Sequence, residues 1–132
     1  MTPADSPPSP PDMASPETVV QQQLEAYNAR DVEAWLATYA DDAKQFEHPA
    51  TLLASGKAQL RERIAVRFRE PNLHARLLHR LCVGQTVIDH ELITRTFPEG
   101  TGTLEIVAIY EVQADRITRA WFISGSKTLD AG

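Results

Sequence analysis

The strongest constraint on the fold is that everything after Pro71 is patterned as β-strand. Apolar and polar residues alternate over residues 73–83, and similar strand-forming segments cover residues 86–96, 103–112 and 116–124. Short turns separate these segments, which predicts hairpins and therefore antiparallel pairing. A sheet of this kind has a face that must be covered, and the second half of the chain contains nothing to cover it.

The first half of the chain contains three amphipathic helices that fit this role. Ser15, Pro16 and Glu17 are typical of a helix start, because they combine an N-cap, a first-turn proline and an acid near the helix dipole. Asp31 caps a second, shorter helix, and after a short strand a third helix is predicted over residues 57–70. The apolar residues at helical spacing are Val20, Leu24 and Tyr27, then Val32, Trp35, Leu36 and Tyr39, then Leu60, Ile64 and Phe68.

This order of elements predicts one α+β domain, in which a mostly antiparallel sheet curves around the three N-terminal helices. A length of 132 residues and a hydrophobic content of 42% suit a single core that needs no metal or disulfide. The domain is expected to span residues 16–126, between a disordered proline-rich tail at residues 1–15 and a C-terminal tail at residues 127–132. The single cysteine, Cys82, is expected to be a small buried hydrophobe.

Charge and hydropathy argue against several classes of partner. The net charge of −5 disfavours nucleic acid, and no apolar run is long enough to cross a membrane. The N-terminal residues lack a signal-peptide pattern, so a cytoplasmic protein is expected. One basic cluster is interpreted as a solvated helix face, with an anion site as the alternative; it consists of Lys57, Arg61, Arg63, Arg67 and Arg69.

A histidine and a carboxylate lie side by side in the segment 39–49, which ends in Phe46-Glu47-His48-Pro49. The chain is expected to leave a helix and enter a strand here, and such a junction directs side chains into a cavity. A neutral imidazole takes up and returns a proton near neutral pH, so His48 is a candidate general base. The alternative is that His48 only caps the strand entrance by hydrogen bonding.

Two later strands carry carboxylates at unusual positions. Strand alternation places Asp89 and Glu91 on one face and His90 on the other. The two carboxylates either line a polar pocket, where they orient His48 or pair with arginines, or lie exposed and paired on the outer sheet face. Glu105 interrupts an apolar strand, where it is either a buried neutral acid or a strand-end carboxylate that reaches solvent.

Several aromatic side chains are expected to build the core and the wall of a cavity, with stacking on a substrate as the alternative role. They are Tyr27, Trp35, Tyr39, Phe46, Phe68 and Trp121. All of these except Tyr39 are candidate substrate-binding residues, together with Glu91. No glycine-rich phosphate loop, nucleophile elbow or zinc signature occurs in the sequence, so no cofactor or metal is expected.

Together, the element order and several motifs resemble the nuclear transport factor 2-like superfamily, and within it the SnoaL-like and ketosteroid isomerase-like proteins. The motifs are Tyr27-Asn-Ala-Arg-Asp-Val-Glu-Ala-Trp35, Tyr39-Ala-Asp-Asp-Ala43, Phe46-Glu-His-Pro49, Gly56-Lys-Ala-Gln-Leu-Arg61, Val107-Ala-Ile-Tyr-Glu-Val112 and Arg116-Ile-Thr-Arg-Ala-Trp-Phe122. The similarity covers residues 16–126 and implies a cone-shaped domain around a pocket. Enzymes, binding proteins and assembly modules all use this fold.

In ketosteroid isomerases an aspartate moves a proton between two carbons, while a tyrosine and a protonated carboxylic acid stabilise the enolate oxygen. The resemblance places His48 at the base position, Glu105 at the acid position and Gln23 at the tyrosine position. It implies cofactor-independent proton transfer, as in an isomerase or cyclase, on a small hydrophobic carbonyl compound. In this interpretation Asp89 or Glu91 orients His48.

Two other functions stay open on the same fold. One is a non-catalytic module that binds a small hydrophobic molecule, and the other is a pure dimerisation or assembly domain. The outer sheet face, expected to carry Tyr110 and Phe122, is predicted to be partly apolar, which indicates a homodimer.

Overall fold

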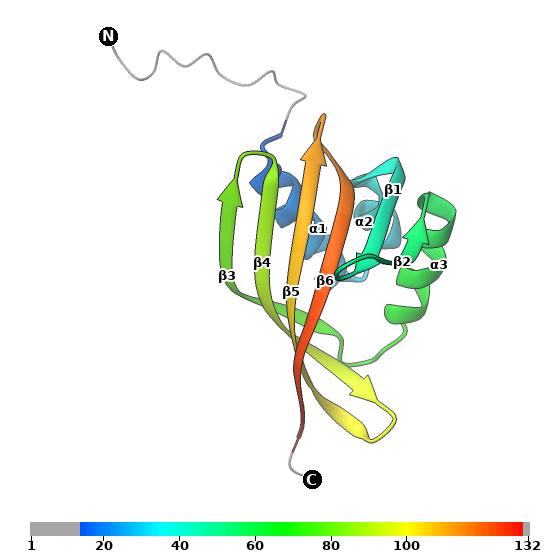
Figure 1. The fold of residues 1–132 in the computed structure, drawn as a ribbon. Coiled ribbons are helices and arrows are strands. Elements are labelled where there is room, and N and C mark those ends of the chain that lie inside the picture. The colour runs from blue at the N-terminus through cyan, green and yellow to red at the C-terminus, as the bar shows by residue number, and fades with distance from the viewer. Residues whose placement is uncertain (1–13, 131–132) are drawn as a thin grey trace.

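The computed structural model describes residues 14–130, so most of the predicted proline-rich tail, residues 1–13, lies outside the described part of the chain. Figure 1 shows three helices and one six-stranded sheet. The elements are α1 (Pro16–Ala29), α2 (Val32–Ala37), β1 (Tyr39–Glu47), β2 (Thr51–Ser55), α3 (Lys57–Arg67), β3 (His74–Val83), β4 (Thr86–Phe97), β5 (Gly100–Gln113) and β6 (Arg116–Leu129). Within this range, none of the helices has the length and apolar character that crossing a membrane would require.

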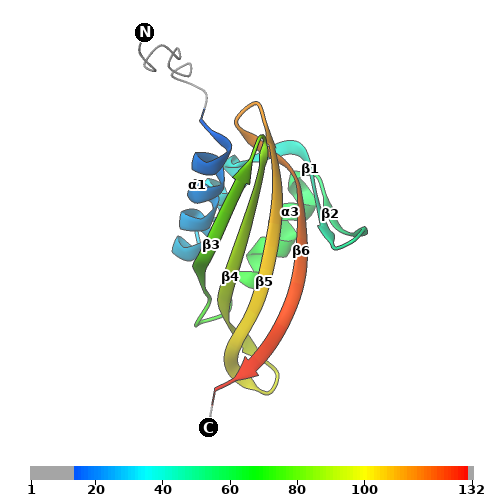
Figure 2. The same ribbon diagram turned by 60° about the vertical axis from the view of Figure 1, so that its left-hand side comes forward.

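The sheet has the strand order β2-β1-β6-β5-β4-β3, and every neighbouring pair is antiparallel except β1 and β6. Its long strands bend together, and the helices lie on the concave side (Figure 2). The predicted α+β cone, with a curved and mostly antiparallel sheet around three helices, is therefore confirmed. Short hairpin turns enforce the antiparallel pairs. Strands β1 and β6 are separated by a long stretch of chain, which allows them to pair in parallel.

The helix starts follow the sequence signals. The Ser15 hydroxyl accepts a hydrogen bond from the Thr18 N–H at 3.1 Å, and the Asp31 carboxylate accepts one from the Ala34 N–H at 3.0 Å. Arg30 closes α1 in the left-handed region at φ 55°, which separates α1 from α2. These caps satisfy backbone donors that a helix leaves open at its first turn.

Several predicted element bounds were wrong. Tyr39 was assigned to the second helix, but it begins β1, where it pairs with Ile117 of β6. The region before α3 holds two strands instead of one, and α3 ends at Arg67 rather than at residue 70. Strand β6 continues through Leu129, so residues 127–129 are not part of a tail. Pairing with a distant strand decides these positions, and local periodicity does not report it.

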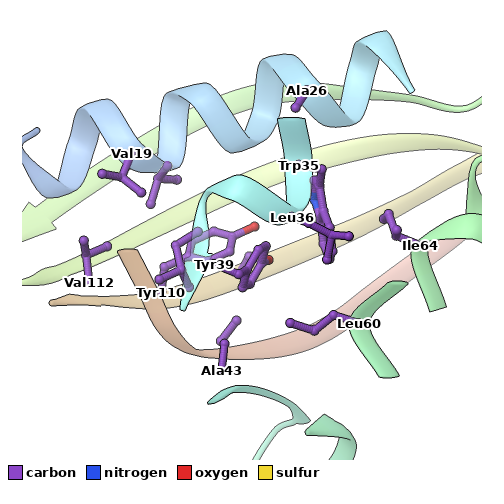
Figure 3. Packing of buried hydrophobic residues seen from close by; sticks show 14 of the residues in the cluster. Val19, Ala26, Trp35, Leu36, Tyr39, Ala43, Leu60, Ile64, Tyr110 and Val112 are labelled. Atoms are coloured by element: carbon purple, nitrogen blue, oxygen red, sulfur yellow. The ribbon is translucent and has the colours of Figure 1, made fainter. Parts of the chain in front are cut away.

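The main core lies between the helices and the concave face of the sheet (Figure 3). Trp35 and Tyr39 contact each other there, with ring centroids 4.5 Å apart. The other members include Val19, Val20, Leu36, Leu60, Ile64, Tyr110, Val112 and Ile117, all buried. Because this core joins α1, α2 and α3 to the sheet, it holds the helices as a cover over the concave face.

The burial of three side chains on the sheet differs from the expectation. Tyr110 and Phe122 were predicted on the outer face, but Tyr110 is buried and both side chains point inward with Ala108 and Val112. Alternation on β5 carries Tyr110 to the same side as its buried neighbours two residues away. Cys82, predicted to be buried, is exposed near the end of edge strand β3.

Candidate functional site

A cavity of about 240 Å³ opens between the helices and the concave sheet face. Aromatic and aliphatic side chains share its wall with a small number of polar and charged groups, which is the usual composition of a small-molecule site. The lining residues are Gln23, Leu24, Tyr27, Trp35, Tyr39, Gln45, Glu47, Leu53, Arg63, Ile64, Arg67, Ala75, Glu91, Ile93, Arg95, Leu104, Ile106, Tyr110, Phe122 and Ser124.

Glu91 is the buried carboxyl group of this cavity. Strand β4 alternates strictly, with Val87, Asp89, Glu91 and Ile93 all buried on the concave side. Only 5% of Glu91 is exposed, and its carboxyl group has no hydrogen-bond or ion-pair partner within residues 14–130. Burial, with a further contribution from the Asp89 carboxylate, raises the pKa of Glu91 to about 8.

Asp89 lies two residues from Glu91 on the same face, but its charge is fully balanced. Its two carboxylate oxygens accept hydrogen bonds from Arg80 Nε at 2.7 Å and Nη2 at 2.9 Å. Arg80 also donates to Gln21 of α1 at 3.0 Å, and Asp89 is completely buried. The expected arginine pairing of Asp89 therefore occurs inside the fold, next to the cavity rather than in its wall.

Tyrosine and glutamine side chains form a polar floor. Tyr110 donates toward the Gln23 carbonyl oxygen at 3.5 Å, and Gln45 donates from Nε2 to the Tyr39 hydroxyl at 3.2 Å. Burial raises the pKa values of Tyr39 and Tyr110, and it raises that of Tyr27 to about 12, so all three phenols stay protonated at neutral pH. Gln23 of α1 and Tyr110 of β5 therefore meet in this floor.

Trp35 contributes a hydrogen-bond donor without an acceptor. Its side chain lines the cavity and is 2% exposed, and its indole Nε1 is buried without a partner within the described residues. Leaving such a donor unpaired costs about 1–3 kcal/mol.

Arginines gather at one side of the cavity. Arg63 and Arg67 are one turn apart on α3, and Arg95 comes from the end of β4. Arg95 holds Glu70 through two hydrogen bonds of 2.8 and 2.9 Å, while Arg67 Nε lies 3.5 Å from the same carboxylate. Arg63 is also exposed to solvent and Arg67 is half-buried, so these two members of the basic cluster lie both on the helix surface and in the cavity wall.

His48 does not lie in the cavity. It follows the last residue of β1 and is exposed, and its backbone N–H donates to the Phe122 carbonyl oxygen at 2.9 Å. Alternation on β1 directs Gln45 and Glu47 to the cavity, and the chain turns away immediately after Glu47. The expectation that His48 lines the pocket is corrected on this ground.

Glu105 lies on the other side of the sheet. Its neighbours Leu104 and Ile106 line the cavity, so the Glu105 side chain points outward, where it is 42% exposed. His90 Nε2 donates to its carboxylate at 2.7 Å, and this hydrogen bond lowers the pKa of Glu105. Glu105 is therefore the solvent-reaching carboxylate of the two alternatives, not the buried neutral acid.

Only some of the aromatic residues predicted to bind substrate line the cavity. Tyr27 and Trp35 line the cavity, whereas Phe46 and Trp121 stack on each other at 5.6 Å outside it. Phe68 packs edge-on against Tyr27 at 5.6 Å and is not part of the cavity wall. Sequence reasoning missed Gln45, Arg95 and Tyr110 as wall residues, and it considered Arg63 and Arg67 as members of an alternative anion site.

No group of three or more His, Cys, Asp or Glu side chains within residues 14–130 is arranged to hold a metal ion. The chemistry of the cavity is instead that of one protonatable carboxyl group, neutral hydrogen-bonding groups, several arginines at one side and an apolar wall. Such a set suits an apolar molecule with a polar atom such as a carbonyl oxygen.

A curved sheet that encloses a cavity under three helices defines the nuclear transport factor 2-like class of proteins, which includes the ketosteroid isomerase-like fold. Comparison with protein families is in agreement: residues 20–120 match the SnoaL-like domain, and the chain belongs to this family. No curated protein matches the chain in sequence.

Solved structures agree with this assignment. An uncharacterized cystatin fold protein from Novosphingobium aromaticivorans is 28% identical, with a TM-score of 0.77 over 83% of this chain and 98% of that one. The epoxide hydrolase/cyclase-like enzyme SalBIII is 15% identical, with a TM-score of 0.75 over 83% of this chain and 90% of that one. A ketosteroid isomerase-like protein from Catenulispora acidiphila, solved with trimethylamine, is 15% identical, with a TM-score of 0.69 over 83% and 85%. At 15% identity, these last two structures share the fold alone.

Proposed function

We propose that the protein catalyses cofactor-independent proton transfer on a small hydrophobic carbonyl compound, with Glu91 as the group that carries the proton. The observation behind this proposal is a buried carboxyl group that faces the cavity without a protein partner and has a pKa near neutrality. A general acid–base group works best when its pKa lies near the working pH. His48 and Glu105 lie outside the cavity, so the proposal assigns them no part in the transfer.

The proton balance of such a reaction closes without another reactant. The Glu91 carboxylate removes a proton from the carbon next to the carbonyl group, which leaves an enolate, and the resulting carboxylic acid returns the proton to a second carbon. The Tyr27 hydroxyl is a donor in the cavity wall that would stabilise the enolate oxygen. Asp89, held by Arg80, serves as a positioning residue beside Glu91.

Isomerisation of a β,γ-unsaturated ketone tests this proposal, because the conjugated product absorbs in the ultraviolet. Suitable substrates are 3-cyclohexen-1-one and a β,γ-unsaturated ketosteroid, which differ in size. We expect Glu91→Gln to lower kcat by a factor of about 10²–10⁴, which is the usual contribution of a general acid–base group. The wild-type rate should rise with pH up to about 8, as the Glu91 carboxylate forms.

His48→Ala and Glu105→Gln are the matched controls, since both side chains lie outside the cavity. If His48→Ala abolishes turnover and Glu91→Gln does not, the assignment of Glu91 is wrong. A wild type that binds the conjugated ketone without turning over either substrate would instead favour a non-catalytic binding module.

A further inference from the structure

We infer that Arg63 and Arg67 form an anion site at the edge of the cavity, so that the molecule bound there is an apolar body with a carboxylate or a similar anionic group. This inference names the substrate class of the proposed function and rests on it. It follows from the number of guanidinium groups at the cavity and from the small number of carboxylates available to balance them.

Arg63 lies against the cavity without a carboxylate partner. Its Nε donates to the Gln45 carbonyl oxygen at 3.2 Å, and within residues 14–130 no Asp or Glu oxygen lies within ion-pair distance of it. Gln45 is buried and also donates to Tyr39, so the amide that orients Arg63 is itself held in place. A guanidinium held by a neutral amide keeps donors available for an anion.

Among the described residues, Arg67 contacts only one carboxylate, that of Glu70, which also binds Arg95. Glu70 already accepts two hydrogen bonds from Arg95 and one from the Thr96 N–H at 3.1 Å, while its contact with Arg67 is 3.5 Å long. Although burial alone would raise it, these hydrogen bonds lower the pKa of Glu70, which stays ionised. Arg67 and Arg95 therefore share one fully engaged carboxylate, and Arg63 has none in the described part of the chain.

The remaining acidic groups of the cavity do not neutralise the positive charge of the arginines. Glu91 is largely protonated at neutral pH, and Glu47 makes no ion pair with Arg63 or Arg67. The positive excess thus sits at the cavity of a chain whose net charge is −5. Repulsion from Arg67, after the larger effect of burial, also lowers the pKa of Arg63, and a bound anion would remove that repulsion.

Other cations of the same helix behave differently. Lys57 lies 3.5 Å from Asp41, and Arg61 forms an ion pair with Glu33 across to α2. Both of these pairs lie outside the cavity wall. Within residues 14–130, the two cations of α3 without a carboxylate of their own, Arg63 and Arg67, are therefore the two in the cavity wall. A uniformly solvated helix face would not show this difference, whereas an anion site would.

Two molecules of nearly the same size and shape test the inference: 2-naphthoate, which is an anion, and 2-acetylnaphthalene, which is a neutral ketone. Titration calorimetry at pH 7 and low ionic strength should show the anion binding more tightly to the wild type. We expect Arg63→Gln and Arg67→Gln each to weaken naphthoate binding about tenfold, because a hydrogen bond to a charged group is lost. The ketone affinity should stay within about twofold.

Arg69→Gln removes the same charge near the end of α3 but at an exposed residue outside the cavity wall, so it should leave both affinities unchanged. Arg63→Lys keeps the charge and should retain most of the naphthoate affinity. Equal weakening by Arg69→Gln, or equal binding of both molecules in every variant, would overturn the anion site.

The outcomes also separate this inference from the proposed function. A protein that isomerises ketones through Glu91 but binds naphthoate no better than 2-acetylnaphthalene has the proposed activity and no anion site. Naphthoate binding that depends on Arg63 and Arg67, in a protein without isomerase activity, supports the anion site and contradicts the proposed chemistry.

Discussion

Asp89 and Glu91 carry the same acidic group on one face of β4, but in the described part of the chain only Asp89 has an ion-pair partner. Asp89 is completely buried and bonded by both oxygens to Arg80, whereas Glu91 faces the cavity without an ion-pair partner among residues 14–130. Burying an unpaired carboxylate is costly, so protonation of Glu91 is the less expensive state. The difference between the two residues comes from their partners, not from their own chemistry.

This difference predicts a specific pH dependence of stability. Because the pKa of Glu91 is raised from 4.5 to about 8, the folded state binds a proton that the unfolded state releases between these values. The contribution of Glu91 to the free energy of unfolding should therefore be complete below pH 4.5 and decrease as the pH rises to about 8. Urea denaturation across this range should show the decrease in the wild type relative to Glu91→Gln; equal slopes for both proteins would contradict it.

At the scale of elements, the Arg80–Asp89 pair connects three parts of the fold. Arg80 belongs to β3 and Asp89 to β4, and the donation from Arg80 to Gln21 reaches α1. Strand β3 is the edge of the sheet, where backbone hydrogen bonds exist on one side only. The ion pair therefore anchors α1 over the edge strand and beside the cavity.

Removing one member of this pair should be much worse than removing both. Arg80→Met leaves the Asp89 charge buried and unpaired, and we expect a loss of about 3–5 kcal/mol in the free energy of unfolding. The double change Arg80→Met, Asp89→Leu should recover most of this loss. Chemical denaturation of the single and double variants measures the coupling, with Lys127→Met at the exposed Glu99 pair as a control that should change stability little.

For the whole molecule, the outer face of the sheet carries apolar side chains that no helix covers. Leu81 is 51% exposed, Val83 63% and Ile123 39%, and the stacked Phe46 and Trp121 lie outside the cavity. Exposed apolar surface of this kind is common at subunit interfaces. The homodimer expected from the sequence stays a prediction, now with different residues than Tyr110 and Phe122 at its centre.

Light scattering coupled to size-exclusion chromatography checks this prediction. We expect the wild type to elute as a dimer and Ile123→Glu to elute as a folded monomer, because a charge at a buried interface is left without compensation. Val66→Glu, at an apolar and more exposed position on α3, is the control and should stay dimeric. A monomeric wild type would contradict the prediction directly.

Local signals in the sequence were sufficient for the elements and the class of fold. The caps at Ser15 and Asp31 and the common face of Asp89 and Glu91 depend on neighbours only a few residues away, and the structure agrees with each of them. These features were predictable because hydrogen bonds and side-chain direction repeat with the period of a helix or a strand.

The composition of the site depended on contacts that no local pattern reports. Alternation shows that two residues share a face, but the packing of the helices decides which face encloses the cavity, and this reversed the expectation for Tyr110. A single step beyond the end of β1 separates Glu47, in the cavity wall, from exposed His48. The sequence by itself thus determined the strands, helices and family, while the tertiary structure decided which charges meet a partner and which are left facing the cavity, because burial and pairing arise only when distant segments pack together.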